Sequence, residues 1–415
     1  MERVPELLNW LAEFMGPDWV SKQLQAFRSY ERVAVRVLTI EEYHPFVRGL
    51  AEGAKMAATA SPSQPLLVSP AAIRAASHAY DLKLVGLYMP SVLRSPGLLG
   101  RLRSSNGGAE SLLFELAVGV HYLLHGCSVE FPELAGLGNT DVLIEWHSQS
   151  VEIQCKRKAP GSGRKVPNPL FKRLVALVGD AWSSAPWTYA IILECGDRLL
   201  KSHLPVLAEE INSRLVAGCQ GPVQIVGGAY SLLVKKQGPR DYRVAAETFV
   251  QEIGEFFDDP TRPPHLALLD KLPMEHLEPG ALSSPAYLLC RSRQHDSVLD
   301  NVMESFREGA RQLEGARPGI VTVHMPEPIT QDTLDRMAMP TALGDALRRE
   351  FDDPNRSLSR AAAVVISGEN LWPFKEGEWW AGFPGVVFRN EGAAHILPDE
   401  YSLLGRLPGM SSRTQ

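Results

Sequence analysis

The sequence is poor in cysteine, and the cysteines that it has do not form a motif. There are only five of them, and no two have the Cys-x-x-Cys spacing; they are Cys127, Cys155, Cys195, Cys219 and Cys290. An odd number of widely spaced cysteines argues against a disulfide framework and against a zinc site built from thiolates. The chemistry of this chain is therefore sought among other side chains.

The sequence also lacks a long uninterrupted apolar run. The longest run, at 112–124, is broken by Glu115 and His121, and it is shorter than the roughly 20 residues that a membrane-spanning helix needs. The first residues include Glu2, Arg3 and Glu6, without the apolar stretch of a signal peptide. We expect a soluble, cytoplasmic protein with no membrane partner.

An excess of positive charge is missing as well. The chain has 42 lysines and arginines against 48 aspartates and glutamates, which gives a formal net charge of -6. This balance argues against a uniformly basic protein that coats nucleic acid. Binding of nucleic acid would require a local basic patch.

The chain of 415 residues is long enough for about two or three domains. Residues 1–105 have mostly helical patterns, 106–258 alternate between helical and strand patterns, and 259–415 have further α/β patterns. The polar, glycine-bearing stretch 104–108 and the proline-rich stretch 260–264 are the expected boundaries. The sequence leaves open whether the third region is a separate unit or an extension of the second.

The second region carries the clearest order of elements. A helix is expected at 109–125, ending at Gly126, because glycine is common directly after a helix. The elements expected after it are strands at 128–131, 140–146 and 150–156, a helix at 168–182 and a strand at 188–194. This order predicts an α/β fold with a mixed sheet flanked by helices.

Polar residues stand at unusual places in this region. Glu115 is the only charged side chain between Ser111 and His125, and a lone carboxylate in so apolar a stretch is costly unless it is paired. Asp141 opens a predicted strand. In the next strand Glu152, Gln154 and Lys156 alternate with apolar residues and therefore share one face.

These residues carry a resemblance to a known family. Phe114-Glu115, Gly126, Asp141 and the run Gln154-Cys155-Lys156 resemble the PD-(D/E)XK nuclease superfamily, over about residues 109–195. The resemblance implies a restriction-endonuclease-like α-β-β-β-α-β core, here with a helical N-terminal region and a C-terminal α/β region. It also implies a divalent cation and hydrolysis of phosphodiester bonds.

The resemblance assigns four catalytic positions. Glu115 matches the acid of the first helix, Asp141 the strand aspartate, Gln154 the acidic position of the half-motif and Lys156 its lysine. Asp141, Gln154 and Glu115 are then the ligands of Mg²⁺ or Mn²⁺, since hard cations prefer oxygen. Lys156 would position the attacking water and the phosphate. Gln154 departs from the pattern because it supplies no charge, and Glu152 on the same face could supply it instead.

A basic segment follows the half-motif. Between Gln154 and Gly179 there is no acidic residue, and a Gly/Ser/Pro loop lies in the middle. Such a segment could grip phosphates without reading sequence. The expected nucleic-acid-binding residues are Arg157, Lys158, Arg164, Lys165, Lys172 and Arg173.

The sequence thus predicts a metal-dependent nuclease that acts on DNA. A second interpretation keeps the fold but not the catalysis, and makes the protein a nucleic-acid-binding or scaffold module of a multi-protein complex. A third is an unrelated α/β protein, in which Glu115, Asp141, Gln154 and Lys156 would not converge. A homodimer or a partner protein stays open.

Overall fold

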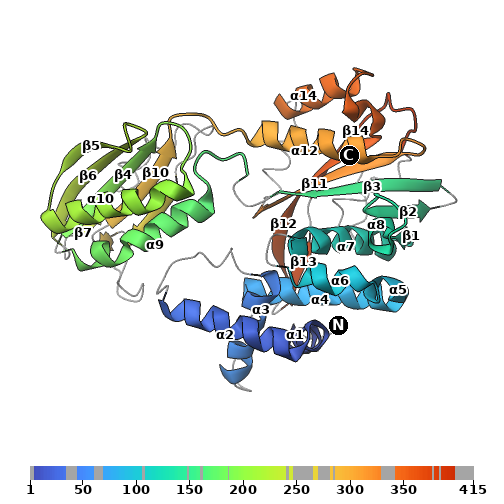
Figure 1. Cartoon of the computed structure of the whole chain (residues 1–415), viewed down its shortest axis with the longest axis horizontal. Coiled ribbons are helices and arrows are strands. Elements are labelled where there is room, and N and C mark those ends of the chain that lie inside the picture. The colour runs from blue at the N-terminus through green and yellow to red at the C-terminus, as the bar shows by residue number, and fades with distance from the viewer. Residues whose placement is uncertain are drawn as a thin grey trace. The chain divides into compact units, whose positions relative to one another are not determined.

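The computed structural model describes residues 4–33, 44–59, 69–104, 108–146, 149–158, 162–185, 187–239, 243–245, 265–269, 281–283, 286–328, 342–375, 378–382 and 385–397. These residues form two compact units, each with a sheet of its own (Figure 1). The first unit comprises 1–32, 43–159 and 299–415, and the second mainly 160–298. Among the described helices, none is long and apolar enough to cross a bilayer.

The N-terminal region is helical, as predicted. Its helices are α1 (Val4–Met15), α2 (Pro17–Val33), α3 (Pro45–Thr59), α4 (Pro70–Tyr88), α5 (Pro90–Leu93) and α6 (Pro96–Leu102). All but the first begin at a proline, whose fixed φ suits the first helical position. The Ser69 side chain caps α4 by accepting a hydrogen bond of 3.1 Å from the backbone N of Ala72.

The predicted helix and three strands of the central region are confirmed. They are α7 (Gly108–Leu124), β1 (Ser128–Glu130), β2 (Val142–Trp146) and β3 (Gln149–Arg157), with the short α8 (Pro132–Ala135) between β1 and β2. The three strands pair antiparallel in chain order, and Val142 lies opposite Ile153. Gly126 has a φ of 87°, a left-handed conformation that glycine adopts freely where a helix ends.

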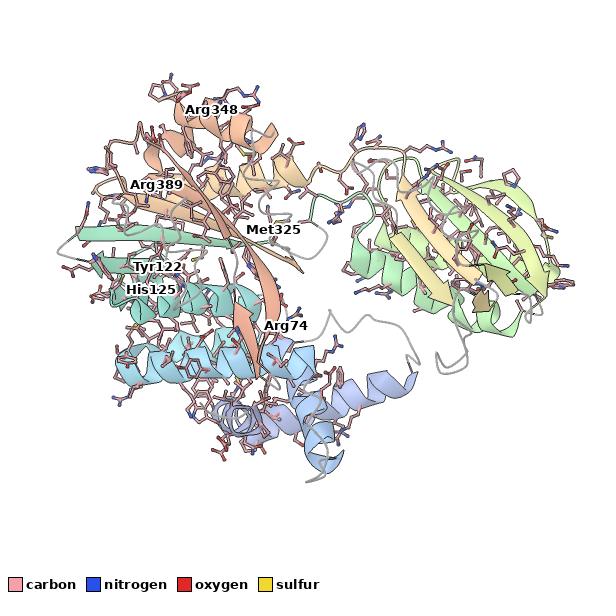
Figure 2. All side chains as sticks on the ribbon, turned by 180° about the vertical axis from the view of Figure 1, so that it is seen from behind. Arg74, Tyr122, His125, Met325, Arg348 and Arg389 are labelled. Atoms are coloured by element: carbon pink, nitrogen blue, oxygen red, sulfur yellow. The ribbon has the colours of Figure 1, made fainter. Side chains whose placement is uncertain are left out.

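The other edge of β3 is also paired within the sheet. The sheet of the first unit continues with elements from the C-terminal region, and its order is β1-β2-β3-β11-β12. These elements are α12 (Val298–Gln312), β11 (Gly319–Pro328), β12 (Ala363–Lys375), β13 (Glu378–Gly382) and β14 (Gly385–Arg389), together with α14 (Ala342–Phe351) and η4 (Ser357–Arg360). β11 runs parallel to both β3 and β12, and β14, which ends at the labelled Arg389 in Figure 2, is antiparallel to β12. The third predicted region therefore extends the first sheet from residue 299 onward, whereas its strands at 265–269, 281–283 and 286–292 belong to the second unit.

The predicted helix at 168–182 and strand at 188–194 form, but in the second unit. They are α9 (Asn168–Ser184) and β4 (Trp187–Cys195), and the sheet order there is β5-β6-β4-β10-β8. The other elements are η2 (Lys201–His203), α10 (Leu204–Ala217), β5 (Gly221–Ile225), β6 (Tyr230–Pro239), β7 (Arg243–Ala245), β8 (His265–Leu269), β9 (Ala281–Ser283) and β10 (Ala286–Ser292). The predicted domain 106–258 thus contains parts of both units, and its expected ends at 105 and 258 lie outside the described residues.

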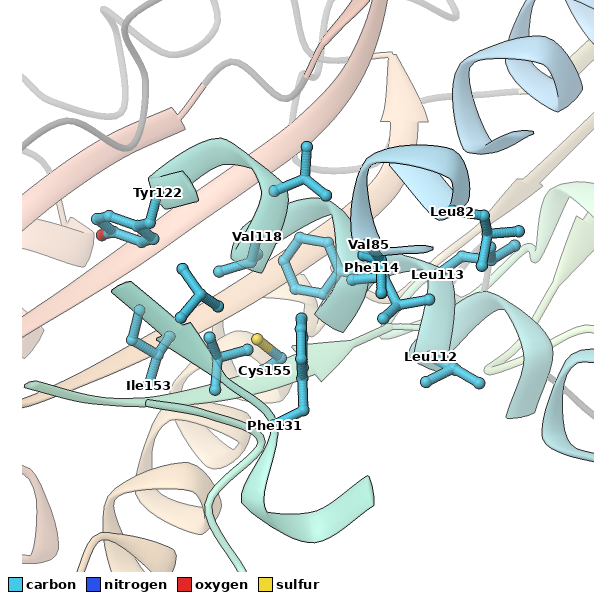
Figure 3. Close-up of a cluster of buried hydrophobic side chains, with 14 of the residues drawn as sticks. Leu82, Val85, Leu112, Leu113, Phe114, Val118, Tyr122, Phe131, Ile153 and Cys155 are labelled. Atoms are coloured by element: carbon cyan, nitrogen blue, oxygen red, sulfur yellow. The ribbon is translucent and has the colours of Figure 1, made fainter. Parts of the chain in front are cut away.

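The core of the first unit lies between α7 and β3. Phe114, Val118 and Tyr122 of α7 gather with Ile153 and Cys155 of β3 (Figure 3). The predicted alternation of β3 is therefore confirmed on its apolar side. This packing fixes where α7 carries Glu115 relative to the strands.

The close packing of Phe131 against α7 depends on Gly119. A Cβ atom on Gly119 would lie 2.4 Å from Cζ of Phe131, which follows β1. That distance is far below van der Waals contact, so only glycine allows this spacing.

Candidate functional site

Glu115 lies buried in the middle of α7, with 5% of its surface exposed. Nη2 of Arg101, on α6, donates to both of its carboxylate oxygens, at 2.9 and 3.2 Å. The positively charged partner of Glu115 thus comes from the preceding helix, α6. Such a charge-assisted contact to both oxygens compensates much of the cost of burying the carboxylate.

The surroundings of Glu115 still disfavour its charge. Burial raises the pKa of Glu115 to about 8, the negative charge of Asp141 adds to this rise, and Arg101 opposes it. The repulsion shows that the two carboxylates from α7 and from the start of β2 share one electrostatic environment.

Asp141 stands directly before β2 and is 6% exposed. Its Oδ2 accepts a hydrogen bond of 2.7 Å from the backbone N of Cys155. Burial raises the pKa of Asp141, while this hydrogen bond and the attraction of Lys156 oppose the rise. Asp141 is therefore held against the half-motif of β3 and lies near its lysine.

Gln154 has no exposed surface. Its Nε2 donates to the backbone O of Asn139 at 3.0 Å, which ties β3 to the loop before Asp141. Its Oε1 is buried and has no hydrogen-bond partner within the described part of the chain. A buried acceptor without a donor costs free energy, and a bound cation would satisfy it.

Lys156 lies near the end of β3, and its Nζ donates to Oε1 of Gln312 at the end of α12. Its side chain is more exposed than those of Asp141 and Gln154. It can therefore contact both the carboxylate cluster and a ligand that arrives from solvent.

Glu152 is engaged elsewhere. It is 1% exposed, and its carboxylate binds Nε of Arg317 at 3.0 Å and the backbone N of Glu314 at 2.9 Å. These contacts join β3 to the segment between α12 and β11. The contacts of Glu152 are therefore separate from those of Asp141 and Glu115.

One acidic residue of the cluster was not foreseen. Glu133, on α8, shares a side-chain hydrogen bond with Asp141, which raises the pKa of Asp141. It also binds Nη1 of Arg101 at 3.2 Å. Its sequence signal was weak because it lies in a connection between two strands, where acidic residues are common.

Glu115 and Asp141 influence each other's charge, as do Asp141 and Lys156, whereas Gln154 is linked to them only through the loop before Asp141. No three histidine, cysteine, aspartate or glutamate side chains within the described ranges are grouped so that they could hold a metal ion. Mg²⁺, however, usually takes only one or two protein carboxylates and fills its other positions with water and phosphate. Glu115 and Asp141 supply that number of carboxylates.

The predicted basic patch is divided between the two units. In the first unit, Arg157 forms an ion pair of 2.6 Å with Glu110, and Lys158 Nζ donates to Oδ1 of Asn301 at 2.9 Å. Both therefore have contacts within the protein.

The other four basic residues belong to the second unit. Arg164 lies 3.5 Å from Asp296, and Lys165 lies 2.7 Å from Asp197, while Lys172 and Arg173 are half-buried on α9. The six residues therefore do not all belong to the unit that carries Asp141 and Lys156. Acids distant in sequence accompany these cations, which a search along the sequence could not detect.

Comparison with known proteins gave no match: no family model, no curated protein and no solved structure is similar to this chain.

Proposed function

We propose that this chain is a divalent-metal-dependent nuclease with a PD-(D/E)XK core that hydrolyses phosphodiester bonds in DNA. The observation that carries the proposal is the convergence of Glu115, Asp141 and Lys156 from α7, the start of β2 and the end of β3. An unrelated fold with a chance motif would leave these side chains apart.

The order of elements supports the same proposal. The first unit runs α7, β1, β2, β3, α12, β11, with β11 parallel to β3. This is the α-β-β-β-α-β order that the resemblance implies. Residues 160–298, which form most of the second unit, then stand as an insertion between the third strand and the second helix.

Buried oxygen atoms support the proposed metal ligands. Asp141, Glu115 and Gln154 would hold Mg²⁺ or Mn²⁺, with the two carboxylates supplying the negative charge. When bound, such a cation lowers the pKa of its water and stabilises charge on the phosphate. The hydrogen bond from the backbone N of Cys155 orients the Asp141 carboxylate directly before β2.

Lys156 carries the contact with the substrate. Its Nζ donates to Gln312 and is attracted by the negative charge of Asp141. A scissile phosphate bound beside Asp141 would therefore lie close to the ammonium group. There it would neutralise the phosphate and orient the attacking water.

A second function is favoured by one specific observation. Arg101 already binds both oxygens of Glu115, and Gln154 is neutral. Together they suit a module that retains the fold but binds nucleic acid, or serves as a scaffold, without cutting. In that case Arg101 plays the role that the cation plays in the nuclease.

A cleavage assay separates the two. Plasmid and linear DNA are incubated with Mg²⁺, Mn²⁺ or EDTA and with wild type, Asp141→Ala, Lys156→Ala or the control Lys201→Ala, which changes an exposed lysine of the second unit. The nuclease proposal expects metal-dependent cutting that Asp141→Ala and Lys156→Ala abolish and Lys201→Ala retains. Absence of cutting, with DNA binding intact in all four proteins, would instead support the binding module.

A further inference from the structure

A second polar site in the first unit uses none of the residues assigned to the candidate functional site. α12, α14 and the segment leading into η4 line an open cavity of about 530 Å³. Its charged lining residues are Arg307, Arg311, Glu350, Arg356 and Arg360. Four positive charges and one negative charge face a single hollow.

The buried carboxylate of Glu350 forms hydrogen bonds with two of these arginines. Glu350, whose side chain is 3% exposed, accepts from Nη2 of Arg307 at 2.9 Å and from Nη1 of Arg356. Burial alone would raise the pKa of Glu350, but these two hydrogen bonds hold it below its ordinary value. An ionised, buried Glu350 therefore fixes two guanidinium groups before any ligand arrives, which reduces the cost of ordering them on binding.

The other two arginines are open to solvent. Arg311 makes only a long contact of 3.4 Å with Glu304, and both side chains are 57% exposed. Arg360 is exposed and has no ion-pair partner among the residues that the structure describes. Asp353, beside Arg356, is also well exposed. Exposed ion pairs of this kind contribute little, so the rim arginines can turn to a ligand.

Arginine clusters in a concave site are suited to phosphate. A guanidinium presents five N–H donors in a rigid plane that matches two phosphate oxygens at once. Only a few of these donors are used by Glu350 and Glu304. The cavity has the size of a small-molecule site, whereas the backbone of DNA is bound along an extended surface.

We propose that this cavity binds a small molecule with two or more phosphate groups, such as a nucleoside di- or triphosphate. Arg307 and Arg356 form the preorganised floor, and Arg311 and Arg360 close on the outer phosphates. The proposal is independent of the nuclease activity, because it uses none of the residues assigned to it.

The test uses calorimetric titration of the full chain with inorganic triphosphate, with ATP and with a short DNA duplex. Arg311→Gln and Arg360→Gln are combined in one variant, because neither arginine holds Glu350. The control is Arg348→Gln, which removes one positive charge from an exposed position of α14 (Figure 2) that does not line the cavity. A melting curve of each variant checks that it is folded.

We expect triphosphate and ATP to bind wild type and Arg348→Gln equally, and the double variant at least about tenfold more weakly, a difference of about 1.4 kcal/mol. Absence of binding to wild type would overturn the proposal, as would equal binding by the double variant. Binding of the duplex alone, with the same dependence on Arg311 and Arg360, would also overturn it and make the cavity a contact for DNA.

Discussion

Oδ2 of Asp141 accepts a hydrogen bond of 2.7 Å from the backbone N of Cys155, the residue between Gln154 and Lys156. This bond joins the start of β2 to the half-motif on β3. It places a carboxylate and a lysine from different strands in one electrostatic environment. The proposed metal site depends on this junction more than on any single residue.

The buried charge of Glu115 should make stability depend on pH. Its pKa rises from 4.5 to about 8 on folding, so between these values the folded chain binds a proton that the unfolded chain releases. This group therefore favours folding at low pH and loses that contribution as the pH rises towards 8. Glu115→Gln removes the effect.

We expect Glu115→Gln to gain stability relative to wild type between about pH 5 and pH 8, by more than about 1 kcal/mol, roughly the equivalent of one pKa unit. Urea unfolding of both proteins across this range measures the difference. Comparing the two cancels the opposite contributions of His78 and His324, whose pKa values are lowered by burial. A constant difference would contradict the raised pKa.

Gln154→Glu tests the neutral position of the half-motif. Without metal, the new carboxylate loses the hydrogen bond to Asn139 O and faces that oxygen instead, so we expect a loss of about 1–3 kcal/mol. With Mn²⁺ the added charge should recover most of it, and half-maximal cleavage should need about tenfold less metal, or 1.4 kcal/mol. Gln149→Glu, at the other end of β3, is the control. A loss that metal does not reduce would place Gln154 outside the cation site.

Glu152→Ala separates structure from catalysis. Arg317 Nε and the backbone N of Glu314 lose their acceptor, so the free energy of unfolding should fall by about 2 kcal/mol. The exposed Glu145→Ala should change it by less than about 0.5 kcal/mol. Cleavage per folded molecule should stay the same in both. If Glu152→Ala also abolished metal binding, Glu152 would supply the charge that Gln154 lacks.

The packing of α12 on β11 can be tested with glycine substitutions. A Cβ on Gly309 would lie 2.4 Å from Cγ1 of Val321, so Gly309→Ala should destabilise the protein by about 1–3 kcal/mol. Gly100→Ala, on α6 with no atom within 4 Å of its added Cβ, should stabilise it by up to about 1 kcal/mol. Thermal melting gives both values, and equal melting temperatures would contradict the position of α12.

Local patterns predicted much of the first unit. The apolar helix around Glu115, the three strands after it and the alternation of β3 follow from residue spacing, because they depend on neighbours in sequence. The pairing of β3 with β11 could not be predicted, since residues 160–298 separate the two halves of the sheet. The strand at 188–194 was expected in the same mixed sheet, but it forms as β4 in the sheet of the second unit.

The site was predicted in part for the same reason. Glu115, Asp141, Gln154 and Lys156 stand in an ordered motif, whereas Arg101 and Glu133 come from a preceding helix and from a connection. Their role arises only from the fold. The ion pairs of the basic segment could not be predicted either, because Glu110, Asp197 and Asp296, which form them, are distant in sequence.

The central claim is that Asp141 and Glu115 bind a divalent cation, and direct binding of Mn²⁺ tests it without relying on activity. Electron paramagnetic resonance of free Mn²⁺ is recorded during titration with wild type, Asp141→Asn and the control Asp197→Asn of the second unit. We expect wild type and Asp197→Asn to reduce the signal of free Mn²⁺ to the same extent, and Asp141→Asn to leave it unchanged. Equal binding by wild type and Asp141→Asn, or no binding by wild type, would contradict the claim.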